Sequence, residues 1–195
     1  MMKTPLAALA LALPLVAGAA VDNYTIDPLH AYPNFWVEHW GLSMMSGRFD
    51  KSTGKFSFDR AARTGAVEFV IETGSVSTGD NDKGARARSR DEHLRAADFF
   101  NAAEFPRMTF RSTKVAFQGD LPSSVEGNLT LLGVTKPVTL TFERFKCGQN
   151  PFNKKDRCGG NAVGKIKRSD FGMKTFVGPV GDEIVLNISF EGDKD

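Results

Sequence analysis

Three histidines and two cysteines are the side chains of this sequence best suited to acid–base, nucleophilic or metal chemistry. A serine or cysteine hydrolase needs a nucleophile, a base and an orienting carboxylate, and no motif here brings such a set together. His30, His39 and His93 are not at metal-ligand spacing, so we expect no metal site. The reactive residues therefore favour a binding protein over an enzyme.

Residues 1–20 have the composition of an export signal. Lys3 supplies a positive start, an apolar run extends from Leu6 to Val16, and 17–19 are the small residues typical of a cleavage site. The run is shorter than the roughly 18 apolar residues that a transmembrane helix needs, and no later run reaches that length. We therefore expect a signal peptide at 1–20, a single domain at 21–195 and a periplasmic location.

Export would bring Cys147 and Cys158 into an oxidising compartment, where a disulfide is the default state of a cysteine pair. The bond would close a loop of about a dozen residues and stabilise the fold by roughly 3 kcal/mol in the chain-entropy model. A metal site is the alternative, but no histidine lies near and one pair supplies too few ligands. We therefore predict a disulfide between the two cysteines.

Net charge and aromatic composition restrict the function further. The formal charge of +2 falls to +1 without Lys3, whereas a nucleic-acid-binding domain normally has a basic face and a high pI, so we expect no nucleic-acid partner. The sequence has 16 Phe against 2 Tyr and 2 Trp. Because phenylalanine has no polar group, this bias is typical of an interior that offers no hydrogen-bond partner, as in a packed core or a lined cavity.

The elements that position these side chains are short segments in which apolar and polar residues alternate. At least seven such segments follow one another, separated by turns and by one helical interruption, which indicates an antiparallel all-β sandwich or barrel. Gly41, Ser43, Ser46 and Gly47 predict a turn or bulge after the first long strand. A barrel of about eight strands can hold one small ligand, whereas a sandwich packs two inner faces together.

The stretch 90–113 interrupts the alternation and predicts a helical plug. Leu94 lies among charged residues, which is typical of a short helix with one apolar turn. Pro106 cannot continue a helix and favours extended geometry before it, so Met108 and Phe110 begin a strand. We expect a helical plug delivered onto the edge of the sheet, with its phenylalanines in a dry environment: Phe99, Phe100, Phe105 and Phe110.

Four separated motifs carry a resemblance to a known family. They are YTIDPLHAYPNFWVEHWGLSMMSGRFD from Tyr24, the stretch from Arg90 to Phe110, GNLTLLGVTKPVTL from Gly127 and IKRSDFG from Ile166. In this order they resemble the YceI-like family of secreted polyisoprenoid-binding proteins. The resemblance implies an antiparallel lipocalin-like β-barrel of about eight strands around a lipid cavity, and it favours the barrel over the sandwich.

The resemblance also implies a function and a site. It implies an exported carrier or reservoir that holds an isoprenoid chain, such as a polyprenyl or ubiquinone-like tail, in the barrel lumen without a catalytic cofactor. All candidate side chains except one histidine are apolar, which suits a chain held by dispersion and exclusion of water. The candidate ligand-binding residues are Phe35, Val37, His39, Phe49, Phe56, Phe58, Phe69, Ile71, Phe99, Phe110, Leu129, Leu131, Leu140, Phe142, Leu186 and Ile188.

Two polar features could meet the head group of such a ligand. His39 is the one inward-leaning polar side chain of the first long strand, and Arg86, Arg88, Arg90 and Arg95 could contact an anionic group. Each feature has an ordinary alternative. The histidine could be merely solvated or hydrogen-bonded, and the arginines could pair with neighbouring carboxylates on a solvated helix face.

Two other functions stay open on the sequence alone. One is a periplasmic enzyme that acts on a lipid inside the barrel, for which His39 is the candidate group. The other is an interaction protein whose barrel is solid. The partners to be tested are an isoprenoid lipid, a transient contact with a membrane or a membrane redox protein, and a second copy in a homodimer.

Overall fold

Antiparallel strands form nearly all of the molecule. The structure, a computed structural model, describes residues 21–195, so the predicted signal peptide lies outside the described residues. The only α-helix of this part is α1 (Arg90–Arg95), and no helix within it is long and apolar enough to cross a membrane. The strands are β1 (Asp22–Ile26), β2 (Tyr32–His39), β3 (Ser43–Phe49), β4 (Ser52–Asp59), β5 (Thr64–Glu72), β6 (Val76–Ser77), β7 (Arg107–Gln118), β8 (Leu121–Leu131), β9 (Val134–Gln149), β10 (Asp156–Lys167) and β11 (Val180–Lys194).

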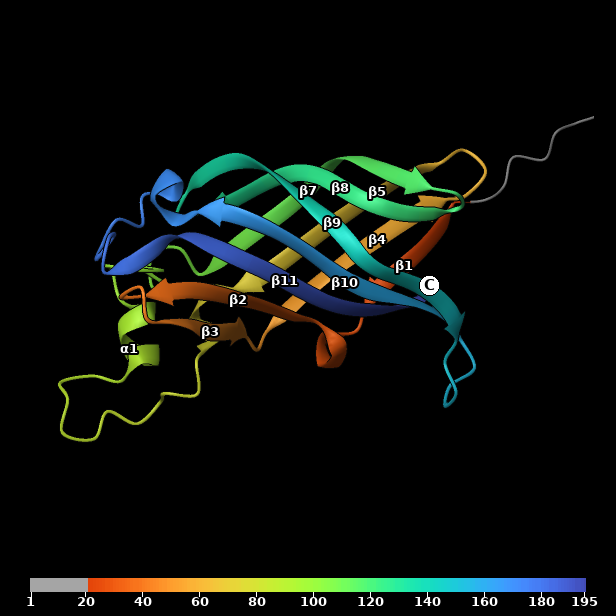
Figure 1. The fold of residues 1–195 in the computed structure, drawn as a ribbon. Coiled ribbons are helices and arrows are strands. Elements are labelled where there is room, and N and C mark those ends of the chain that lie inside the picture. The colour runs from red at the N-terminus through yellow and green to blue at the C-terminus, as the bar shows by residue number, and fades with distance from the viewer. Residues whose placement is uncertain (1–20) are drawn as a thin grey trace, which may run out of the picture.

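These eleven strands make eight barrel strands, because three pairs are each one long strand with a break. Both β1 and β2 pair with β11 on one side. On the other side, β1 pairs with β4 and β2 pairs with β3. In turn, β4 pairs with β5 and β3 with β6. The ring continues through β7, β8, β9 and β10 and closes at β11 (Figure 1). The predicted antiparallel barrel of about eight strands is confirmed.

The breaks of the three long strands lie side by side without opening the wall. The first follows from Pro28, which has no backbone donor, and from Asp27, whose carboxylate accepts a hydrogen bond from the Leu29 amide at 3.0 Å. The Asp50 amide donates to the Ser75 carbonyl at 3.1 Å, so the second and third breaks remain bonded to each other. The interrupted segments are 27–31, 50–51 and 73–75.

The turn predicted from the glycines and serines after β2 is shorter than expected. Only 40–42 form the turn, and strand β3 begins at Ser43. Gly47 is a strand residue on which the ring of Phe35 lies, since a Cβ atom there would come within 2.4 Å of the Phe35 Cζ atom. The glycine that suggested a turn is therefore required by close side-chain packing.

Helix α1 and the residues after it form the predicted plug, which lies at one end of the barrel and not at the edge of an open sheet. Ser89 and Glu92 form a reciprocal cap, in which the Glu92 amide donates to the serine hydroxyl at 3.1 Å and the Ser89 amide donates to the glutamate at 2.8 Å. Arg95 donates to two backbone carbonyls in 74–76, which ties the helix to the third break. Phe99 and Phe100 are buried beneath it.

The opposite end carries the disulfide between Cys147 and Cys158, which confirms the predicted bond. The two cysteines lie directly opposite each other on β9 and β10, and Cys158 is fully buried. The sequence had suggested that they would flank an irregular loop. They instead join two paired strands, which continue to the Gln149–Asp156 pair, so the irregular part is confined to 150–155.

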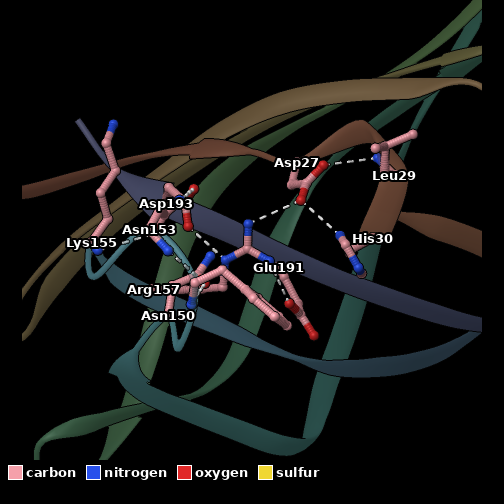
Figure 2. A network of polar contacts seen from close by, with 10 residues as sticks. Asp27, Leu29, His30, Asn150, Asn153, Lys155, Arg157, Glu191 and Asp193 are labelled. Carbon is pink, nitrogen blue, oxygen red and sulfur yellow. Dashed lines mark hydrogen bonds and ion pairs between the residues drawn. The ribbon is translucent and has the colours of Figure 1, made fainter.

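Arg157 braces the same end across three strands. From β10 its guanidinium donates to Glu191 at 2.8 Å and Asp193 at 2.6 Å on β11, and to Asp27 after β1 at 2.9 Å (Figure 2). The hydrogen bond from Arg157 holds the pKa of Asp193 below its ordinary value. Because β1 and β11 share only three paired residues, this ion network strengthens the seam at which the barrel closes.

Candidate functional site

The barrel contains an internal cavity of about 200 Å³. Its lining comes from all eight barrel strands and from the helical plug, and it consists almost entirely of aliphatic and phenyl groups. Such a surface can exclude water and hold hydrocarbon by dispersion, and it offers no group for acid–base chemistry.

The structure brings the predicted apolar residues together around this cavity. They arrive from strands far apart in the sequence because the period-two alternation directs one face of each strand inward. The predicted residues that line the cavity are Phe35, Val37, Phe49, Phe56, Phe58, Phe69, Ile71, Phe99, Phe110, Leu129, Leu131, Leu140, Phe142, Leu186 and Ile188.

His39 is the one candidate residue that does not line the cavity. It is the last residue of β2, and its ring stacks on Trp40 with centroids 5.5 Å apart. The chain leaves the barrel wall at this point, so the side chain lies at the rim. His39 therefore does not contact the cavity, and its predicted contact with a ligand head group at the barrel mouth stays a prediction.

Phenyl rings are concentrated at both ends of the cavity. Toward the disulfide end, Phe145 lies 5.5 Å from Phe58 and 5.6 Å from Phe142, measured between ring centroids, in edge-on arrangements. Toward the plug, Phe49 lies 5.8 Å from Phe35 and 5.2 Å from Phe100. The empty volume therefore lies in a lumen whose two ends are filled by aromatic side chains.

Several lining residues are absent from the predicted set, among them Phe145 and Phe190. Phe190 shares a face with Leu186 and Ile188 in the alternation of the last strand, so the sequence pattern does contain the signal for it. Phe145 has no such signal. A bulge in β9 inserts one residue opposite β10, so Phe142 and Phe145 both point inward although their separation is odd.

Arg168 is the only charged residue in the lining, and its donors are used within the chain. The guanidinium donates to four backbone carbonyls in 173–181, at 2.8 to 3.1 Å, and is almost fully buried. Burial lowers the pKa of Arg168, and the nearby carboxylate of Asp182 opposes that shift. The residue therefore organises the connection between β10 and β11 over the plug end.

The arginine cluster near the plug is paired with carboxylates or carbonyls of the same chain. Arg86 makes two hydrogen bonds to Asp80 at 2.6 and 2.7 Å, which lower the pKa of that carboxyl group. Arg88 contacts Asp98 at 3.0 Å, and Arg95 donates to backbone carbonyls. These partners favour the ordinary alternative over a role in binding an anionic head group.

Metal-ligating side chains are also dispersed. Within 21–195, no group of three histidine, cysteine, aspartate or glutamate residues lies close enough to hold a metal ion. The site that the geometry does assemble is the apolar lumen.

Comparison with known proteins agrees with this architecture. A family model described as the YceI-like domain matches residues 24–192. The chain belongs to the YceI-like family. It is 43% identical over 180 residues to the protein YceI of Escherichia coli O6:H1, and the match covers 90% of each chain. The resemblance carried by the four sequence motifs is thereby confirmed.

Solved structures show the same fold. BcnA from Burkholderia cenocepacia aligns with a TM-score of 0.69 at 24% identity, over 85% of this chain and 98% of that one. A polyisoprenoid-binding domain from Saccharophagus degradans, implicated in plant cell wall breakdown, aligns with a TM-score of 0.63 at 17% identity, over 88% and 98% of the two chains. At these identities the likeness concerns the fold.

Proposed function

We propose that this YceI-like protein holds the hydrocarbon chain of an isoprenoid lipid in its lumen and acts as a carrier or reservoir in the periplasm. The observation that carries the proposal is the apolar cavity inside a closed barrel. Membership of the YceI-like family supports it, as does the fold shared with a domain described as polyisoprenoid-binding. On this proposal the chain is a binding protein and not an enzyme, and its ligand is a polyprenyl or quinone tail.

The energetics of such a lumen suit transfer. Each buried methylene is worth roughly 0.8 kcal/mol against water, so a prenyl chain would strongly avoid release into solvent. The relevant competitor is a bilayer, in which the same carbons are already dry. Transfer between lumen and bilayer is then close to neutral, which allows a carrier both to load and to release.

The size of the cavity implies that the lumen adjusts to its ligand. A cavity of about 150 Å³ accommodates benzene, whereas ligand pockets usually measure roughly 300 to 1,000 Å³. The 200 Å³ present here would hold only part of a prenyl chain. We propose that partly buried rings, among them Phe35, Phe142 and Phe145, rotate as the chain enters.

The proposal includes a transient membrane contact, because the proposed cargo dissolves in bilayers. A membrane redox protein and a second copy of the chain are further predicted partners, and solution experiments would test each of them. Export is tested by sequencing the N-terminus of the periplasmic protein, which should begin at Ala20 or Val21.

Native mass spectrometry of gently purified protein tests the proposed ligand. We expect a reproducible mass increment that organic solvent removes and that added prenyl lipid restores. Protein that carries no lipid and takes up none, while remaining folded, would refute the proposal in favour of an interaction protein.

A further inference from the structure

Exposed hydrophobic side chains gather on two neighbouring connections of the barrel. Large hydrophobic side chains of residues 21–195 are mostly buried or half-buried, and five of the eight exposed ones lie on these connections. We call these five the apolar rim: Trp40, Leu42 and Met44 from the β2–β3 turn and the start of β3, and Phe176 and Val177 from the β10–β11 connection. Their exposed fractions are 66%, 83%, 52%, 57% and 42%.

The two parts of the apolar rim are held together by backbone contacts. The Trp40 amide donates to the Pro179 carbonyl at 2.6 Å, and His39 pairs with Val180. Both connections project from the end of the barrel that carries α1 (Figure 1). The rim is therefore one surface at the plug end.

Backbone conformation marks the two aromatic residues of the rim. Trp40 has a φ of 58° and Phe176 a φ of 56°, in the left-handed region that glycine and asparagine adopt most easily. Each position thus combines backbone strain with an exposed ring. The Trp40 ring stacks on His39 and the Phe176 ring lies near His93, but most of each residue stays in water, so the exposed part is better explained by something that covers it.

The rim is continuous with the lumen. The ring of Phe176 lies 6.5 Å from that of Phe99, which lines the cavity. Phe100 follows Phe99 and contacts Phe49, a further lining residue, at 5.2 Å between centroids. Aromatic side chains therefore lead from the exposed rim, past the plug, to the cavity.

We propose that the apolar rim inserts into the surface of a lipid bilayer and places the plug end of the lumen against it. This inference rests on the proposed function, since it names the surface through which the lumen exchanges its cargo. Two adjacent loop tips with a tryptophan suit the membrane interface, where amphipathic rings prefer to lie. A stable protein interface would need roughly 20 to 30 residues a side, far more than these five.

Charge around the rim indicates which lipids it accepts. Glu38 and Lys174 are both exposed beside it. His93, which lies next to Phe176, contacts Asp98, and that carboxylate is also paired with Arg88. Charges of both signs therefore surround the rim. Insertion would be driven by apolar burial and not by attraction to anionic lipid. Docking should accordingly occur on uncharged phosphatidylcholine vesicles and change little between low and high salt.

The test uses the purified exported protein and phosphatidylcholine vesicles that contain no prenyl lipid. In a Trp36→Phe background, Trp40 is the only tryptophan. Its emission should shift to the blue when vesicles are added and be quenched by brominated acyl chains. Trp40→Asn and Phe176→Asn should each weaken partition, measured by vesicle flotation, by about ten-fold. Because asparagine tolerates a positive φ, relief of backbone strain should offset the lost ring contacts, and both variants should fold with a stability close to that of the parent protein.

Phe152→Asn is the matched control. Phe152 is 93% exposed but lies in the β9–β10 turn at the disulfide end, so its substitution should leave vesicle partition unchanged. An unquenched Trp40, equal losses in the Phe152 variant, or burial of Trp40 by dimerisation without vesicles would each overturn the proposal. Lipid retention is measured on the same samples. It separates the proposed lipid-binding function from docking through the apolar rim, because a protein without cargo can still dock and one with cargo can fail to dock.

Discussion

Ala162 offers a way to fill the cavity without adding charge. Its side chain is buried and lines the lumen from β10. A phenyl ring in Ala162→Phe would need about the space of benzene, roughly 150 Å³, and so would occupy most of the 200 Å³. A ligand would lose the space for about six carbons, worth about 5 kcal/mol at roughly 0.8 kcal/mol each, so its affinity should fall more than about a thousand-fold.

The same substitution should not destabilise the protein. Filling about 150 Å³ removes a cavity cost of up to about 3.6 kcal/mol at roughly 24 cal/mol per Å³. Misfitting contacts cost about 1 to 3 kcal/mol. The free energy of unfolding should therefore stay level or rise by up to about 3 kcal/mol. Loss of lipid with retained stability is the combination that distinguishes a blocked lumen from a damaged fold.

The assay combines native mass spectrometry with denaturant unfolding. Val163→Phe is the control, since the neighbouring residue of the same strand alternates to the outer face and is absent from the cavity lining. The control should keep its lipid. Our reasoning would be refuted by a stable Ala162→Phe protein that binds prenyl lipid as tightly as the parent, because the ligand would then lie outside the cavity.

Three further outcomes are expected. Leu140→Lys should release bound lipid, measured by native mass spectrometry, because it places an unpaired charge in a dry lumen. Arg157→Met should lower the free energy of unfolding by about 2 kcal/mol at pH 7. Arg157 lowers the folded-state pKa of Asp193 below its ordinary value of 3.8. The stabilisation is therefore present above pH 3.8 and is lost as the pH falls through the lower folded-state pKa. In acid unfolding curves, the wild type and the variant should converge at that low pH. Backbone amides of 78–105 should exchange with solvent faster than those of β9 and β10, measured by hydrogen exchange.

The barrel could be predicted because its signal is repeated and local. Each strand shows its inner face through alternation, so residues such as Phe56, Phe69 and Leu186 could be assigned without knowing their neighbours. The plug could be predicted because Pro106 separates a helix from a strand. The family resemblance then decided between a sandwich and a barrel, which alternation alone could not do.

Features that depend on partners across strands could not be predicted. The bulge that turns Phe145 inward is set by the register between β9 and β10. The role of Gly47 depends on the ring of Phe35 on the opposite strand. The cavity volume is the volume enclosed by eight strands minus the volume of the side chains that fill it. This difference is small and cannot be calculated from composition. The exposure of Trp40 likewise depends on a backbone angle.

The two ends of the barrel are built so differently that exchange of cargo is expected at only one of them. At the disulfide end, a covalent bond and the three ion pairs of Arg157 hold β9, β10, β11 and β1 together. At the other end, a helix of six residues is capped by its own residues and is tied by Arg95 to the backbone of 74–76, where the strand formed by β5 and β6 is interrupted. Local opening costs least where few continuous backbone bonds must be lost. The plug can therefore move while the seam stays closed, and the apolar rim lies at the end where the lumen would open.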